Sequence, residues 1–180
     1  KYIDFFSISR NYNYNNLSKF NKEFDISNSI FKSSEKPVNI LVNDNIIYSL
    51  DKKLFLNQYN LNDGKLINKI KLDNSSLDQF SVPQSLAFYN DNLFINFSDG
   101  MIIKYDFNGK IIWQQTLGDI NKTPIKFYNQ NLIILLSNKI ISLNSVNGQI
   151  LWEYEYIQDN PLSSIGGKII TNKHLIYFVL

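Results

Sequence analysis

The same succession of short apolar runs and turn-favouring residues repeats along the chain. This internal repeat limits the folds that the chain can adopt. Copies of this order begin at Asn45, Asn92, Asn131 and Asn172, at intervals of 47, 39 and 41 residues. In each complete copy, runs rich in Ile, Leu, Phe and Tyr alternate with Asn, Asp and Gly residues that favour tight turns, and a further β-type run precedes each copy. Four β-type runs in about 40–50 residues match one blade of a propeller. The sequence therefore predicts an all-β chain that forms a β-propeller, or part of one, with four-stranded antiparallel blades.

The residue composition favours strands over helices. The chain has a single Ala, and aromatic or β-branched residues fill many of its apolar positions. No stretch repeats its apolar residues at the helical period of 3.6. With 180 residues, 44% of them hydrophobic, the chain can bury the core of an ordinary domain.

We treat the whole chain, residues 1–180, as a single propeller segment. The predicted blades are 37–82, 83–123 and 124–160, followed by a partial blade over 161–180. The run ahead of each copy, such as Pro83 to Tyr89, is assigned to the innermost strand of its blade. Residues 1–36 contain two β-type runs, Tyr2 to Ile8 and Phe20 to Ile26, which we assign to strands of a preceding blade.

Two copies end in the same motif, which consists of an Asp or Asn, a short loop, a Gly, two apolar residues and a Trp. The motif residues are Asp106, Gly109 and Trp113 in one copy and Asn144, Gly148 and Trp152 in the next. This order resembles the pyrroloquinoline-quinone-like propeller repeat over residues 37–180. The resemblance implies that each Gly turns the outer hairpin and that each Trp packs between adjacent blades. The first copy keeps Gly64 but has Asn68 in the Trp position, so we expect its contact with the neighbouring blade to be weaker or differently filled.

Charge and hydropathy exclude two classes of partner. The chain has 18 Lys and Arg against 16 Asp and Glu, for a formal net charge of +2, and its cations are scattered. A nucleic-acid-binding surface needs clustered cations, so we expect no nucleic-acid partner. The longest apolar runs fall far short of the roughly 20 residues that span a bilayer as a helix, so we expect no transmembrane segment in this chain.

Residues that could carry catalysis are sparse. The chain has no Cys and a single histidine, His174, so thiol chemistry and a two-His metal site are excluded. His174 falls at a predicted turn, and we interpret it as a solvated turn residue and not as the base of a Ser-His-Asp triad. Glu153 and Glu155 alternate with aromatic residues, which places both carboxylates on one face of an outer strand. We interpret them as a solvent-facing pair, and we predict no catalytic, cofactor-binding or metal-binding residue in this chain.

The resemblance allows two functions, because one fold serves both. Quinoprotein dehydrogenases hold a quinone and a calcium ion, and that pattern includes an adjacent Cys pair and a cluster of Asp, Asn and Glu. Here Cys is absent and no Glu falls on a predicted inner strand. We therefore predict a non-catalytic protein-interaction scaffold of the BamB type, with a fragment of a quinoprotein dehydrogenase or other propeller enzyme as the alternative.

A BamB-type scaffold implies a place and a partner. The resemblance implies a periplasmic protein anchored to the outer membrane by a lipidated Cys upstream of Lys1, with an outer-membrane β-barrel insertase as its protein partner. No docking-loop motif of that family can be matched here, so the partner-binding residues stay open. The flanks of an open arc of blades are apolar, and we expect the chain to be a fragment of a larger ring that associates with itself when isolated.

Overall fold

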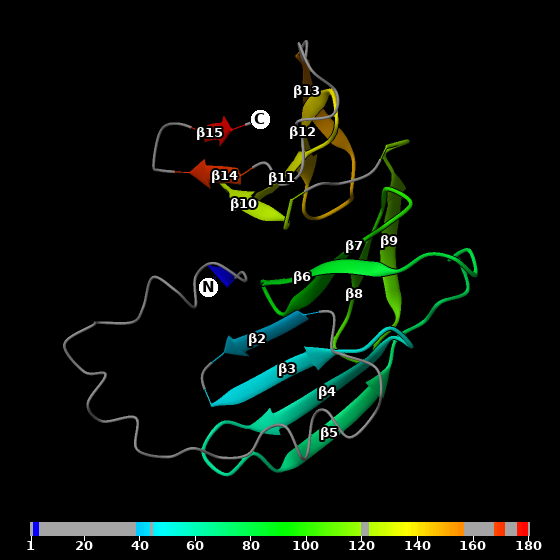
Figure 1. The fold of residues 1–180 in the computed structure, drawn as a ribbon, viewed down its shortest axis with the longest axis vertical. Coiled ribbons are helices and arrows are strands. Elements are labelled where there is room, and N and C mark those ends of the chain that lie inside the picture. Colours follow the sequence, from blue (N-terminus) through cyan, green and yellow to red (C-terminus); the bar gives the residue numbers. More distant parts are fainter. Residues whose placement is uncertain are drawn as a thin grey trace, which may run out of the picture.

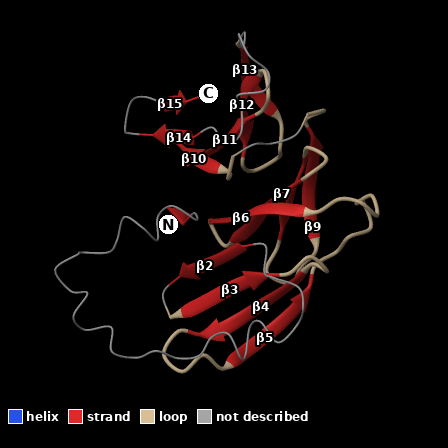
Figure 2. Cartoon of the chain, viewed as in Figure 1, coloured by secondary structure: helices blue, strands red, loops and turns tan. Residues whose placement is uncertain are grey.

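The computed structural model describes residues 2–3, 39–43, 45–119, 123–156, 168–171 and 176–179. These residues form strands and turns, with no helix among them (Figures 1 and 2). The strands are β1 (Tyr2–Ile3), β2 (Asn39–Asn43), β3 (Ile46–Leu50), β4 (Phe55–Asn60), β5 (Leu66–Lys71), β6 (Pro83–Tyr89), β7 (Asn92–Phe97), β8 (Met101–Tyr105), β9 (Ile111–Thr116), β10 (Lys126–Tyr128), β11 (Asn131–Leu135), β12 (Lys139–Asn144), β13 (Ile150–Glu155), β14 (Lys168–Thr171) and β15 (Ile176–Val179).

Each set of four consecutive strands from β2 to β13 makes one antiparallel sheet. The first sheet is β2-β3-β4-β5, the second contains β6-β7-β8-β9, and the third is β10-β11-β12-β13. Strands β14 and β15 form a separate hairpin. Figure 1 shows the three sheets following one another in chain order. The predicted fold class, an all-β propeller arrangement of four-stranded antiparallel blades, is confirmed.

The N-terminal strand takes a different place from the one that the sequence suggested. Strand β1 pairs antiparallel with β6, Tyr2 opposite Tyr89 and Ile3 opposite Phe88, and so adds a fifth strand to the inner edge of the second sheet. The sequence had assigned the run Tyr2 to Ile8 to a preceding blade. The rest of that run, and the run Phe20 to Ile26, lie outside the described residues.

The turns and irregularities of the sheets repeat with the sequence. The hairpins β6–β7 and β10–β11 turn at residue pairs with positive φ, Asn90 and Asp91 at 45° and 57°, and Asn129 and Gln130 at 46° and 69°. Two consecutive residues with positive φ define a tight turn whose twist matches that of the flanking strands. In each of the first three sheets, the pairing between the last two strands shifts register at one equivalent place, at Gln58/Tyr59, Lys104/Tyr105 and Ser142/Leu143.

The core lies between the sheets. Along β6, β7 and β8, one set of alternating residues packs toward the first sheet, including Phe88, Ile95 and Tyr105. The intervening set, including Phe94 and Ile102, packs toward the third sheet. Successive side chains of a strand point to opposite faces, so the second sheet is buried on both sides, which explains its nearly continuous apolar runs.

A buried tyrosine ties the second sheet to the loop that follows the first. Tyr105 is fully buried, and its hydroxyl donates a hydrogen bond of 3.0 Å to the backbone carbonyl of Asp73. Burial, and then the nearby Asp73 carboxylate, raise the pKa of Tyr105 above its ordinary value. The folded state therefore favours the neutral phenol.

We predict that Tyr105→Phe changes the dependence of stability on pH. At neutral pH the loss of one buried hydrogen bond should lower the free energy of unfolding by about 1 kcal/mol. An ordinary tyrosine ionises near pH 10, so above about pH 10 the unfolded wild-type chain loses this proton before the folded one, and the wild type loses stability. The variant has no phenol at this position and does not lose stability in this way. The difference in unfolding free energy between wild type and variant, measured in urea, should therefore shrink above about pH 10. A gap that stays constant from neutral to alkaline pH would contradict the raised pKa.

Candidate functional site

The sequence pointed to an indole between blades, and Trp113 on β9 occupies such a position. Its ring packs edge-on against Phe94 of β7 at a centroid distance of 5.9 Å. Its Nε1–H donates a hydrogen bond of 3.2 Å to the backbone carbonyl of Ser145, in the β12–β13 turn of the third sheet. We call this contact between the second and third sheets, made by Phe94, Trp113 and the turn 144–149, the tryptophan dock.

The turn that receives the indole depends on Asn144 and Gly148. The Asn144 Oδ1 atom accepts a hydrogen bond of 2.8 Å from the Val146 N–H, and the Gly148 N–H donates one of 2.9 Å to the Asn144 carbonyl. Gly148 has a φ of 74°, and a Cβ built there would lie 2.7 Å from a ring carbon of Trp113. Glycine is therefore required both for the backbone conformation and for the close approach of the indole.

A lysine that the sequence did not single out completes the tryptophan dock. Lys104 lies opposite Trp113 in the β8–β9 pairing, is 8% exposed, and donates a hydrogen bond of 3.0 Å from Nζ to the Ser145 carbonyl. Its Nζ lies 5.5 Å from the centroid of the Phe94 ring, and burial lowers its pKa below the usual lysine value. The equivalent residues in the other sheets are Gln58 and Ser142. The sequence repeat therefore contains no pattern that indicates a role for Lys104.

The interface between the first and second sheets uses another aromatic residue. Here the motif turn begins at Asp106, whose Oδ1 accepts hydrogen bonds from the N–H groups of Asn108 at 2.9 Å and Lys110 at 2.8 Å. A Cβ built on Gly109 would lie 2.8 Å from the Lys71 carbonyl, so this turn sits directly on β5.

Asn68 of β5 stands where the second sheet has Trp113, and it is exposed. The turn residue Phe107 instead stacks on Phe88 at 6.0 Å, and Phe88 packs on Tyr48 at 4.5 Å. The ring at this interface therefore comes from the turn and not from the outer strand.

The second motif tryptophan lies in the open. Trp152 pairs across the strands with Ser142, as Trp113 does with Lys104, but it is 42% exposed. This differs from the expectation that Trp152 packs between blades. In the hairpin β14–β15, Ile169 and Ile176 pack with Ile133 and Leu135 of β11 and Ile140 of β12.

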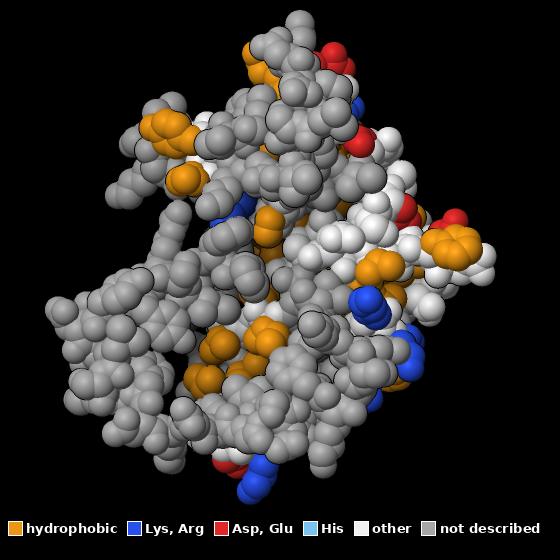
Figure 3. Space-filling model, in the orientation of Figure 1, with side chains coloured by type: hydrophobic (Ala, Val, Ile, Leu, Met, Phe, Trp, Pro, Cys, Tyr) orange, Lys and Arg blue, Asp and Glu red, His pale blue; other side chains and the backbone are white. Residues whose placement is uncertain are grey.

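Strand β13 consequently presents apolar side chains to solvent. Ile150, Leu151, Trp152 and Tyr154 are 45%, 47%, 42% and 60% exposed, and we call these four residues the β13 strip. Figure 3 shows hydrophobic side chains at the top of the molecule, where Figure 1 places β13. At the far end of the described sheets, a Cβ on Gly64 would meet no atom within 4 Å, so this motif turn is also without a neighbouring blade among the described residues.

The carboxylates on β13 are placed as solvent-facing groups. Glu153 makes an ion pair with Lys139 at 3.1 Å and is 46% exposed, and Glu155 is exposed and lies opposite Lys139 in the strand pairing. His174 lies outside the described residues. In the part of the chain that the structure describes, no group of three or more His, Cys, Asp or Glu residues is placed to hold a metal ion. No helix there is long and apolar enough to cross a membrane.

The repeated sheets and their aromatic contacts define a propeller of four-stranded repeats. The family model for outer membrane protein assembly factor BamB matches residues 53–178. This range covers more than half of the 180 residues, so the chain belongs to this family, and the resemblance found in the sequence is confirmed. No curated protein matches the sequence.

Several solved structures of low sequence identity are similar to this chain, and the first of them shares its fold. The computationally designed Ika4 protein has a TM-score of 0.59 and 11% identity, over 80% of this chain and 84% of its own. A quinohemoprotein alcohol dehydrogenase from Comamonas testosteroni has a TM-score of 0.49 and 16% identity, over 65% of this chain and 20% of its own. BamB from Moraxella catarrhalis has a TM-score of 0.44 and 14% identity, over 64% of this chain and 35% of its own.

We predict that the two motif tryptophans contribute unequally to stability. Trp113→Ala should lower the free energy of unfolding by about 3 kcal/mol, because it empties an aromatic contact between two sheets. Trp152→Ala should cost less than about 1 kcal/mol, as expected for a largely solvent-facing residue. Because the two residues hold equivalent repeat positions, each variant is the control for the other in urea unfolding. Equal losses would show that Trp152 is buried in solution.

Proposed function

We propose that this chain is a non-catalytic protein-interaction scaffold that resembles the BamB-type components of outer-membrane β-barrel assembly. Membership of the family supports a periplasmic location, an outer-membrane anchor through a lipidated Cys upstream of Lys1, and an outer-membrane β-barrel insertase as the partner. In this proposal the sheets form the scaffold, and exposed surfaces on them bind the partner.

The observation that carries this proposal is the β13 strip. All four strip residues are exposed on one outer strand, and Trp152 and Tyr154, two positions apart, share one of its faces. Exposed apolar surface of this kind is typical of protein-binding sites. Tyr and Trp are enriched among the residues that dominate binding energy at interfaces. Tyr154 lies opposite Ile140, which packs with Ile169 of β14, so a partner at Tyr154 extends an existing apolar interface.

We predict that the β13 strip binds a purified outer-membrane β-barrel insertase. The double variant Trp152→Ala/Tyr154→Ala should weaken binding by about 30-fold, the effect of losing an aromatic hot spot of about 2 kcal/mol. Biolayer interferometry with the immobilised insertase measures the affinity. The control is Leu66→Ala/Ile67→Ala, which removes two side chains of similar exposure, 53% and 54%, from the outer strand of the first sheet.

Two results would contradict the scaffold function. One is the absence of saturable binding to the insertase by the wild-type chain. The other is a calcium-dependent absorbance of bound quinone together with dye-linked alcohol oxidation, which would assign the chain to a propeller dehydrogenase.

The same open flank predicts self-association of the isolated chain. Apolar blade flanks are suited to packing against another copy of the same kind of surface. Multi-angle light scattering should therefore show dimers or larger species that become monomeric in Trp152→Ala/Tyr154→Ala. A wild-type chain that stays monomeric at high concentration would argue that the strip is closed within one molecule.

A further inference from the structure

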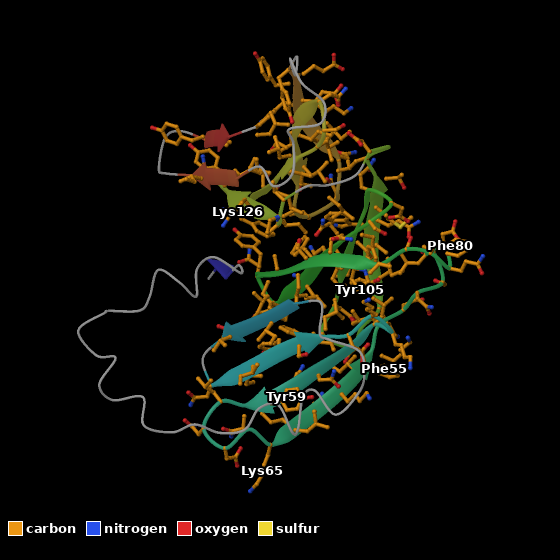
Figure 4. All side chains as sticks on the ribbon, viewed as in Figure 1. Phe55, Tyr59, Lys65, Phe80, Tyr105 and Lys126 are labelled. Carbon is orange, nitrogen blue, oxygen red and sulfur yellow. The ribbon has the colours of Figure 1, made fainter. Side chains whose placement is uncertain are left out.

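A pocket of about 320 Å³ opens beside the first sheet and is not part of the β13 strip. One wall is the β3–β4 turn with Lys52 and Lys53, and the other is the β5–β6 connection with Leu77 and Asp78. Phe55 at the start of β4 and Lys71 at the end of β5 lie between these walls. Figure 4 shows Phe55 at this end of the first sheet. The volume is at the low end of the range of ligand pockets, about 300–1,000 Å³.

The lining combines positive charge with an apolar floor. Lys52, Lys53 and Lys71 face the pocket together with a single acid, Asp78. On the ring of Phe55, the Nζ atoms of Lys69 and Lys71 lie 4.3 Å and 4.8 Å from the centroid. Figure 3 shows blue Lys or Arg side chains on the side of the first sheet where β4 begins. Ammonium groups beside an aromatic ring favour a ligand that carries both a carboxylate and an apolar part.

The turn that supplies two of the lysines is held in one conformation. The Asp51 Oδ1 atom accepts a hydrogen bond of 2.9 Å from the Phe55 N–H, and the Leu54 N–H donates one of 3.0 Å to the Asp51 carbonyl. Leu54 has a φ of 62°, which is unfavourable for a branched residue, and its side chain is only 5% exposed in the core. Burial of Leu54 therefore keeps the turn in a strained shape, a feature that clusters at ligand sites.

Hydrogen bonds also hold the opposite wall and the central lysine. The Ser81 hydroxyl donates to the Asp99 carboxylate in the β7–β8 turn, which ties the β5–β6 connection to the second sheet. The Lys71 ammonium donates to the Lys53 carbonyl across the pocket. An ammonium group has three donors, so Lys71 keeps two for a ligand while its position is set by the protein.

We propose that this pocket binds a short acidic segment of a partner protein. Carboxylates of the segment meet Lys52, Lys53 and Lys71, and one apolar side chain lies against Phe55. The pocket holds one or two side chains, which favours an extended segment over the surface of a folded domain. Phe80, 76% exposed on the same connection, extends away from the sheets (Figure 4). This site goes beyond the proposed function, because it shares no residue with the β13 strip.

The test measures binding of a fluorescein-labelled peptide, Asp-Glu-Phe-Asp-Glu, to the full chain by fluorescence anisotropy. The neutral peptide Asn-Gln-Phe-Asn-Gln is the ligand control. The acidic peptide should bind more tightly than the neutral one, and added salt should weaken it. Lys53→Gln/Lys71→Gln should weaken binding about fivefold, as expected when two partly exposed charge contacts are lost. Lys65→Gln/Lys139→Gln removes the same charge from two positions outside the pocket, in the β4–β5 turn and on β12, and should leave the affinity unchanged.

A second variant guards against misfolding of the first. Gln79→Glu places a carboxylate at the exposed rim of the pocket and should also weaken the acidic peptide. Equal losses in the pocket and control lysine variants, or equal binding of the two peptides, would overturn the proposal. So would tighter binding to vesicles of phosphatidylcholine and phosphatidylglycerol that depends on Lys53 and Lys71, since the pocket would then serve a membrane surface. Insertase binding through the β13 strip is measured separately, so failure of either proposal leaves the other standing.

Discussion

The second sheet of this chain has to bury both of its faces, and the packing of its neighbours follows from that constraint. In the second sheet, one set of alternating residues forms the core with the first sheet and the other set forms the core with the third. A strand with two buried faces needs apolar residues at nearly every position. The sheets therefore stack in chain order, polar residues are concentrated in turns and outer strands, and any face without a neighbouring sheet becomes an exposed apolar surface.

The interface between the first and second sheets and the interface between the second and third sheets are packed with aromatic residues at equivalent positions. Tyr48 and Phe88 between the first and second sheets correspond in register to Phe94 and Phe127 between the second and third, and both pairs are in contact, at 4.5 Å and 5.1 Å. A further ring is added at each interface, Phe107 from a turn at one and Trp113 from an outer strand at the other. The aromatic contact is thus kept while its source in the repeat changes.

The two proposed binding surfaces lie where the packing between sheets ends. Within the β13 strip, Trp152 and Tyr154 hold the positions at which Trp113 and Ile70 contact the next sheet. The lysine pocket lies where a turn of the first sheet meets the connection to the second, and hydrogen bonds to the second sheet hold the wall formed by that connection. The inter-sheet cores therefore set the geometry of both proposed surfaces.

The sequence by itself determined the repeat, the four strands of each blade, the turns and the family, because alternating apolar residues and Asn, Asp and Gly signals act over short distances along one chain. It also singled out Trp113, Asn144 and Gly148, which the structure brings into one contact. Only the tertiary structure decided that Lys104 joins them, that Phe107 serves where Asn68 replaces Trp, that β1 pairs with β6, and that Trp152 stays exposed. Each of these four features depends on contacts between residues that are far apart in the sequence, and a local sequence pattern does not specify such contacts.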